Sequence, residues 1–262
     1  MIDRGSGPPV VLVPGVQGRW EWMRPAVDAL AARCRVLTTS LAGEPGSGNG
    51  VDPAAGFDSF VAQVDRLRER AGLDRVAVCG VSFGGWVALR YAVERPDRVS
   101  ALVLVSTPGP RWRPGRRVER YLRYPWLTAP IFVGGAPFRL GPEIVAAFDG
   151  WWPRARFAAA HSLRVLAAPT TPARMTRRVR QARGIDFGAA CRAVRAPTLV
   201  VTGEPRLDRV VRAESTLEYV TAIPGARAAR LDRTGHIGLV TRPERFAEIV
   251  GEFVTGNEVP GA

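Results

Sequence analysis

The chain has 262 residues, 46% of them hydrophobic, and its 37 basic residues, all arginine, outnumber 24 carboxylates to give a net charge of +13. This hydrophobic content is near the average of globular proteins, so a disordered chain is excluded. Three scattered cysteines, at positions 34, 79 and 191, exclude a disulfide framework and a cysteine-based metal cluster. No apolar run is long enough to cross a membrane, and the first apolar run is far shorter than that of a signal peptide.

The positive charge raises the question of a nucleic-acid partner. The arginines are spread along the chain, with higher density only over residues 111–117 and 174–183. We therefore predict no nucleic-acid partner and no stable membrane insertion; the milder consequence of the charge is attraction to anionic substrates or membrane surfaces. The expected location is cytoplasmic, and the sequence leaves the oligomeric state open.

In chain order, short apolar β-branched runs alternate with helical patterns. This alternation predicts an α/β protein with a mostly parallel, doubly wound sheet that carries helices on both faces. The predicted strands are Val10–Val13, Arg35–Thr39, Val76–Cys79, Ala101–Ser106, Thr198–Thr202 and Ala226–Leu231. The predicted helices are Glu21–Ala32, Phe57–Ala71, Phe83–Glu94, Ala213–Ala222 and Pro243–Phe253.

The alternation lapses between Ser106 and Pro197, where prolines and tryptophans are frequent. Helical pieces are predicted there at Arg117–Tyr124, Pro142–Phe148, Arg154–Leu166 and Pro172–Arg183. We therefore predict a core formed by residues 1–108 and 195–262, and a helical lid over residues 109–194. Ligands of open parallel sheets bind at the carboxyl ends of the strands, so the lid is expected to roof the pocket.

Three side chains of the lid are candidates for contact with a ligand. Trp112 and Trp151 are predicted to bind substrate, because the aromatic and leucine content of the lid favours a hydrophobic pocket. His161 lies in a helical run and is interpreted as a half-buried lid residue, with substrate contact as the alternative.

The most informative motif runs from Gly80 to Gly84 and has the form G-x-S-x-G, with Ser82 at its centre. An apolar strand precedes it and a helical pattern follows it. A serine on such a tight turn stands at the edge of the sheet, with the N–H groups of the helix N-terminus aimed at it. We predict that Ser82 is a nucleophile; the alternative is a glycine-rich turn in which the serine is an incidental helix cap.

A serine hydroxyl needs a base to remove its proton, and the base is usually an oriented histidine. His236 follows the last predicted strand and precedes the final helix, so it is expected at the same sheet edge as Ser82. A carboxylate should orient the imidazole. Asp208, after the strand Thr198–Thr202, is predicted for this role, with Glu204 as the alternative. Either acid could instead pair with neighbouring arginines.

Together these residues resemble the α/β-hydrolase fold superfamily, in particular its lid-bearing serine hydrolases, which include esterases, lactonases and carbon–carbon bond hydrolases. The chain order Ser82, Asp208, His236 matches the family's order of nucleophile, acid and histidine. The resemblance covers nearly the whole chain, and the elbow and the Gly235-His236 loop are its specific parts.

The chain departs from the family in three places. Most relatives carry a His-Gly pair after the first core strand, where this chain has Gly15-Val16. Relatives usually place the acid where Arg206 stands here, and Asp208 restores the spacing if two residues are inserted. No strand is predicted before Val10, so the first strand or two of the family's sheet are expected to be missing.

The resemblance also implies an oxyanion hole, one donor of which comes from the loop after the first core strand. Because that donor is a backbone N–H group, the histidine of the relatives is not needed. The N–H groups of Val16 and Phe83 are therefore expected to hold the oxyanion, each worth about 3–4 kcal/mol of barrier. Gln17 is expected to add a side-chain contact to the substrate.

The function implied is hydrolysis of a small or medium ester-type acyl substrate through an acyl-enzyme on Ser82, without cofactor or metal. A serine at the elbow argues against dehalogenase or epoxide hydrolase chemistry, which uses an aspartate there. Carbon–carbon bond hydrolysis and acyl transfer on the same triad remain alternatives. So does a ligand-binding member of the fold, although such a protein would need neither the serine nor the histidine. The only partner expected is the small-molecule acyl substrate.

Overall fold

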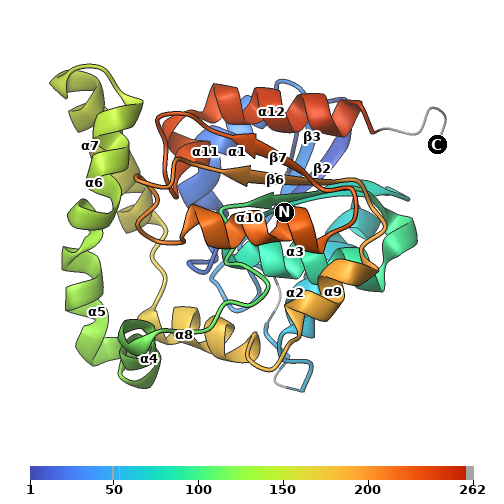
Figure 1. The fold of residues 1–262 in the computed structure, drawn as a ribbon, viewed down its shortest axis with the longest axis horizontal. Helices are drawn as coiled ribbons and strands as arrows, with labels where there is room; N and C mark the ends of the chain where they lie inside the picture. Colours follow the sequence, from blue (N-terminus) through green and yellow to red (C-terminus); the bar gives the residue numbers. More distant parts are fainter. Residues whose placement is uncertain (49, 53, 258–262) are drawn as a thin grey trace.

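The computed structural model describes residues 1–48, 50–52 and 54–257. Its centre is a seven-stranded sheet with the strand order β1-β3-β2-β4-β5-β6-β7 (Figure 1). β1 pairs with β3 in the antiparallel sense, and the other neighbouring pairs are parallel. The strands are β1 Ile2–Arg4, β2 Pro9–Val13, β3 Arg35–Thr38, β4 Val76–Val81, β5 Val99–Val105, β6 Thr198–Thr202 and β7 Arg227–Arg230.

The edge strand β1 corrects one expectation, since the sequence predicts no strand before Val10. Ile2 lies opposite Thr38 and Arg4 opposite Val36 in the ladder with β3. Three residues, two of them charged, carry too little apolar pattern to be recognised as a strand. The correction concerns only one edge of the sheet. The six parallel strands were predicted, and the expected ligand site at their carboxyl ends is not affected.

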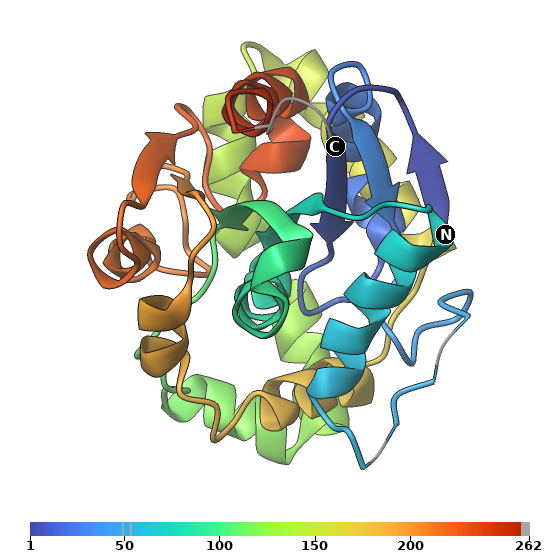
Figure 2. The same ribbon diagram turned by 90° about the vertical axis from the view of Figure 1, so that its right-hand side faces the viewer.

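Helices cover both faces of the sheet, as the doubly wound architecture predicts (Figures 1 and 2). One face carries α2, α3, α9 and α10, and the other carries α1, α11 and α12. These helices are α1 Arg24–Leu30, α2 Asp58–Arg70, α3 Phe83–Glu94, α9 Phe187–Ala193, α10 Ala213–Ala222, α11 Gly238–Thr241 and α12 Pro243–Thr255. Two short 3-10 helices, η1 Trp20–Met23 and η2 Pro96–Arg98, precede α1 and β5. No helix in the described part of the chain is both long and apolar enough to span a membrane.

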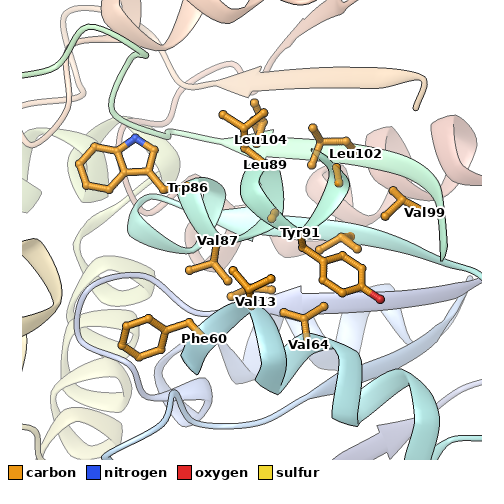
Figure 3. Close-up of a cluster of buried hydrophobic side chains, with 14 of the residues drawn as sticks. Val13, Phe60, Val64, Trp86, Val87, Leu89, Tyr91, Val99, Leu102 and Leu104 are labelled. Atoms are coloured by element: carbon orange, nitrogen blue, oxygen red, sulfur yellow. The ribbon is translucent and has the colours of Figure 1, made fainter. Parts of the chain in front are cut away.

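The inner strands β2 to β6 are buried on both sides, which is why they are mainly apolar runs, while the edge strands β1 and β7 are charged and largely exposed. In β4, Val76 and Val78 pack into the cluster on one face, while Ala77 and Cys79 pack into the cluster on the other. Figure 3 shows the first of these clusters, where side chains of α2, α3 and β5 meet over the sheet. The two clusters hold the strands in place and therefore fix the loops at their carboxyl ends.

Between β5 and β6, five consecutive helices form a layer that we call the cap helices. They are α4 Arg116–Arg123, α5 Pro125–Gly134, α6 Ala136–Ala147, α7 Trp151–Ala167 and α8 Pro172–Gln181. They lie beyond the carboxyl ends of the strands, at the left in Figure 1. The sequence does not predict α5, because Pro125 and Pro130 were interpreted as breaks. Pro125 instead takes the first helical position, where the missing N–H group has no intrahelical role.

α9 packs with the core rather than with the cap helices. Its Phe187, Ala190 and Cys191 are buried in the cluster that contains α3. The boundary expected from the sequence assigns these residues to the lid, which was placed over residues 109–194. By its packing, α9 therefore belongs with the core, although it precedes β6 in the chain.

Candidate active site

Ser82 lies at a sharp turn between β4 and α3. Its φ of 53° and ψ of −118° give a non-glycine residue a positive φ, which costs about 1–3 kcal/mol and persists only where the surroundings enforce it. Its N–H donates to the Val105 carbonyl at 2.8 Å, and its carbonyl accepts the Gly85 N–H at 2.9 Å. These bonds hold the serine at the carboxyl edge of the sheet.

Glycine is required on both sides of this turn. A Cβ on Gly80 would lie 2.2 Å from the carbonyl oxygen of Gly84, and a Cβ on Gly84 would lie 2.4 Å from that of Val13. Both contacts are too short for any side chain, so strand, turn and helix approach this closely only because neither residue has one. The absence of side chains brings the first turn of α3 against the end of β2.

The loop after β2 lies beside the serine. The chain leaves β2 toward β3 and later returns to β4 on the other side, so the two loops meet at a topological switch point. A hydrogen bond of 2.8 Å from the Gly18 N–H to the Gly15 carbonyl closes a turn that contains Val16. A Cβ on Gly15 would lie 3.5 Å from Ser82 Cβ. Phe83 opens α3, whose first N–H groups have no intrahelical acceptor.

The structure brings Asp208 and His236 together, on the loops that follow the adjacent strands β6 and β7. Asp208 Oδ2 lies 3.2 Å from His236 Nδ1, and both side chains are buried. The other carboxylate oxygen accepts the N–H groups of Val210 at 3.0 Å and Val211 at 2.8 Å. The carboxylate is therefore fixed by the backbone on one side and orients the imidazole on the other.

Glu204, the alternative acid, makes a different set of contacts. Its Oε1 accepts the Arg233 N–H at 2.6 Å, and its own N–H donates to the Thr234 carbonyl at 2.8 Å. Arg233 has a φ of 62°. Glu204 thus stabilises the turn that leads to His236, while the imidazole is paired with Asp208.

Ser82 and His236 lie at the same edge of the sheet. Their chain neighbours Val81 and Ile237 pack in one hydrophobic cluster, and each of the two residues is 9% exposed. In the described part of the chain no hydrogen bond joins Ser82 to His236.

A buried carboxylate that the sequence reasoning missed lies next to His236. Glu143 of α6 is fully buried, and it accepts the Ile237 N–H at 3.1 Å and the Thr241 hydroxyl at 3.4 Å. Burial raises the pKa of Glu143 to about 7, against the opposing effect of the backbone N–H groups of Ile237 and Gly235. The available signal was that Glu143 is the only carboxylate of α6.

The electrostatics at His236 favour its protonated form. Burial lowers the pKa of His236, but the charge and hydrogen bond of Asp208 and the charge of Glu143 together outweigh burial, so the pKa is raised. With Nδ1 held by Asp208, Nε2 is the nitrogen that can exchange a proton with a substrate or a nucleophile.

A second contact joins α6 to the loop of His236. The Arg233 guanidinium donates to the Ala146 carbonyl at 2.7 Å and pairs with Asp149 at 2.5 Å. Together with the Glu143 contacts, this places both sides of the histidine loop against one cap helix and its C-terminal end.

A buried ion pair joins the other end of the cap to the loop after β2. Arg178 of α8 donates to Glu44 at 2.6 Å and to the Val16 carbonyl at 2.9 Å. Glu44 also accepts the Thr170 hydroxyl at 2.7 Å. A Cβ on Gly18 would lie 2.6 Å from the Arg178 guanidinium carbon. Arg178 is one of several arginines in its run, and no local pattern pairs it with Glu44, which is 134 positions away in the chain.

The predicted substrate residues lie in different surroundings. Gln17 is half-buried in the turn beside Ser82. Trp112 packs 5.4 Å from Trp86, between ring centroids, at the edge of the core cluster. Trp151 is 74% exposed at the start of α7. The structure brings only Gln17 next to the elbow, and the substrate role of all three stays a prediction.

His161 has the position that the lid interpretation expects. It is half-buried in α7 and stacks on Phe157 with ring centroids 5.7 Å apart. Burial lowers its pKa, so the ring is neutral near neutral pH. Among the residues that the structure describes, no group of three or more His, Cys, Asp or Glu side chains could hold a metal ion.

Comparison with known proteins agrees with this geometry. A family model described as alpha/beta hydrolase fold matches residues 8–243. Polyketide synthase ThaQ of Burkholderia thailandensis is 31% identical over 264 residues, covering 97% of this chain but only 12% of that synthase. The pimeloyl-acyl-carrier-protein methyl ester esterase of Nitrosomonas europaea is 29% identical over 255 residues, covering 92% of this chain and 94% of the esterase.

Solved structures give the same fold. The enol-lactonase from Burkholderia xenovorans LB400 superposes with a TM-score of 0.77 at 21% identity, over 97% of this chain and 95% of the lactonase. The chain therefore belongs to the α/β-hydrolase fold family, and it is an α/β-fold hydrolase.

Proposed function

We propose that the protein is a serine hydrolase that cleaves a small or medium ester-type acyl substrate through an acyl-enzyme on Ser82. The observation that carries the proposal is the strained turn that presents Ser82 at the sheet edge on which Asp208 and His236 are paired at 3.2 Å. In nucleophilic catalysis, an oriented, buried imidazole activates a serine that is held on such a turn.

In the proposed mechanism, Ser82 Oγ attacks the acyl carbon while His236 Nε2 takes its proton. The tetrahedral intermediate collapses, and the leaving alcohol receives that proton from His236. Water, deprotonated by the same imidazole, then attacks the acyl-serine ester and releases the acid. Asp208 holds the ring and stabilises its cation throughout. A hydrogen bond from the Ser82 hydroxyl to His236 Nε2 is expected in the substrate complex, because catalytic hydrogen bonds shorten there.

The oxyanion would be held by backbone donors. The N–H of Phe83, at the start of α3, and the N–H of Val16, in the turn after β2, lie on the two loops that flank Ser82. Arg178 supports this arrangement, because it binds the Val16 carbonyl and so fixes the orientation of that turn. Backbone donors of this kind act only if they are already in place when the charge develops.

The substrate class is proposed from the site and from a relative. An elbow serine forms an acyl-enzyme with esters, thioesters or lactones, and the curated relative from Nitrosomonas europaea is named as a methyl ester esterase. The segment 109–194, which we propose as the lid, would roof the acyl group with its apolar and aromatic side chains. Carbon–carbon hydrolysis and acyl transfer would use the same three residues.

A panel of nitrophenyl esters, lactones and thioesters tests the proposal. Ser82→Ala should reduce turnover by roughly 10⁴-fold or more, because it removes the nucleophile. Ser106→Ala is the matched control: Ser106 is also buried, directly follows the neighbouring strand β5 and has a φ of 43°. Turnover that survives Ser82→Ala, or that is lost equally in Ser106→Ala, would contradict the proposal. A β-diketone and an added alcohol acceptor in the panel report carbon–carbon cleavage and acyl transfer.

A further inference from the structure

The net charge of the protein is concentrated in one segment. Residues 109–194 contain 16 arginines and 4 carboxylates, which is 12 of the 13 net positive charges, so the remainder of the chain is close to neutral. The uneven distribution means that an anionic partner would be attracted to this segment, which includes the cap helices, rather than to the remainder of the chain.

The same segment exposes most of the large apolar side chains on the protein. Of the 14 exposed large hydrophobic residues in the described part of the chain, 11 lie between positions 124 and 166. Isolated exposed apolar residues are ordinary, but a contiguous group marks an interaction site.

α5 is the clearest case, because it has no charged residue and no buried residue. Its outward positions are 126, 127, 130, 131, 133 and 134, which are all apolar. Among them Leu127 is 76% exposed and Trp126 is 64% exposed. A helix that is apolar all round is normally covered. Contacts with the other residues that the structure describes leave the outward face of α5 exposed.

The neighbouring helix α4 carries exposed arginines without ion-pair partners among the described residues. α4 packs against α5 through the bend at Tyr124, and both lie at the outer end of the cap, at the lower left in Figure 1. In or just before α4, five arginines are exposed (Arg113, Arg116, Arg117, Arg120 and Arg123). Among the described residues none of the five has an ion-pair partner.

We propose that this cap hairpin, α4 with α5 (Arg116–Gly134), docks on the surface of an anionic lipid bilayer. The arginines meet the headgroups, and the outward face of α5 enters the apolar boundary beneath them, with Trp126 at the interface. Ten helical residues extend about 15 Å, half of what is needed to span the hydrocarbon core. The docking is therefore peripheral and reversible.

The charge distribution favours this occupant over two others. A second copy of the chain would bring two strongly positive caps together, which like-charge repulsion opposes. A nucleic acid would satisfy the arginines but would leave the uncharged face of α5 exposed to water. An anionic bilayer surface, with an apolar layer beneath its headgroups, uses both features.

Sedimentation with vesicles tests the proposal. The full chain should bind vesicles that contain phosphatidylglycerol but not vesicles of phosphatidylcholine alone, and salt should weaken the binding. Leu127→Glu with Ile131→Glu should reduce binding roughly tenfold or more, and Arg116→Gln with Arg120→Gln should do the same. The matched controls are Leu217→Glu, at an exposed leucine of α10, and Arg70→Gln with Arg227→Gln, which remove the same charge from the core.

Each variant is checked by circular dichroism, and none touches the site residues. The proposal is overturned if the chain does not bind anionic vesicles, or if core and cap variants lose binding equally. It is also overturned if the arginine pair matters but the α5 pair does not, because the interaction is then charge adsorption alone. A change in oligomeric state with the α5 variant, without a change in vesicle binding, would identify a second copy as the occupant and refute the lipid surface.

Discussion

At the scale of single residues, Ser82 and Glu143 are held in states that a free residue would avoid. Ser82 keeps a positive φ, and Glu143 keeps a carboxyl group out of water with a pKa of about 7. Such costs are sustained by the surrounding structure and concentrate at functional sites. Ser82 lies at the carboxyl edge of the sheet, and Glu143 contacts the loop of His236 at that edge, where we propose that the chemistry takes place.

The first prediction concerns the acid. Asp208→Asn should reduce ester turnover by about 10⁴-fold while the protein stays folded, because an amide cannot stabilise the imidazolium or hold the same tautomer. Glu204→Gln should reduce it far less, since Glu204 accepts a backbone N–H of the histidine loop and an amide oxygen can do so too. Steady-state kinetics of both variants decide the matter: a large loss in Glu204→Gln with little loss in Asp208→Asn would reverse the assignment.

The second prediction concerns Glu143 and pH. Because the charge of Glu143 raises the pKa of His236, Glu143→Gln should move the acidic limb of kcat/KM to lower pH. Glu244→Gln, at an exposed glutamate of α12, serves as the control and should leave the limb in place. A profile that does not move, or that moves equally in both variants, would refute a link between Glu143 and His236.

Glu143 also makes stability depend on pH with a definite sign. Its native pKa of about 7 lies above the ordinary value of 4.5, so the folded state keeps a proton that the unfolded state has lost. This contribution is fully present below about pH 4.5, declines as the pH rises, and is lost above about pH 7. It amounts to roughly 3 kcal/mol. Urea unfolding of the wild type and of Glu143→Gln across this range should give curves that diverge as the pH rises.

At the scale of elements, two of the cap helices contact the loops of the proposed site. α6 contacts the histidine loop through Glu143, and α8 contacts the turn after β2 through Arg178. The histidine loop and the turn after β2 are thus held between the core sheet and two different cap helices. This makes cap integrity a condition for the proposed activity.

The buried pair of Arg178 and Glu44 gives the third prediction. Arg178→Met should lower the free energy of unfolding by about 3–5 kcal/mol, because it leaves Glu44 charged and buried without its main partner. It should also lower kcat, since the Val16 turn loses its hydrogen bond. Arg245→Met, which breaks the exposed pair with Glu248, is the control and should change little. Similar losses in both variants, by urea unfolding, would contradict this role.

The elements show what a single sequence can and cannot predict. The six parallel strands and the five main core helices were predicted, and all of them except the exposed edge strand β7 carry an apolar pattern that packs on the sheet. α5 was missed because a proline at a first helical position resembles a break. Ser82, Asp208 and His236 could be proposed from the sequence because the proposed chemistry restricts the residue types, and their catalytic role stays a prediction. Glu143, Arg178 and Glu44 were missed because their roles depend on contacts across the cap that no local pattern encodes.

At the scale of the whole molecule, a nearly neutral core carries a strongly basic, partly apolar cap. The core residues include 21 arginines and 20 carboxylates, which balance locally in many exposed ion pairs. The net charge of +13 therefore belongs almost entirely to residues 109–194. The proposed docking on an anionic bilayer follows from this charge distribution, and its test does not depend on the chemistry proposed at Ser82.

The central claim is that Ser82 is activated by His236, and covalent labelling tests it most directly. A fluorophosphonate should modify the wild-type protein, and mass spectrometry should find the adduct on the peptide that contains Ser82 and on no other serine. Labelling should be abolished in Ser82→Ala, retained in Ser106→Ala, and slowed by orders of magnitude when His236 is replaced by alanine. An unlabelled wild-type protein, or an adduct that persists in Ser82→Ala, would contradict the account.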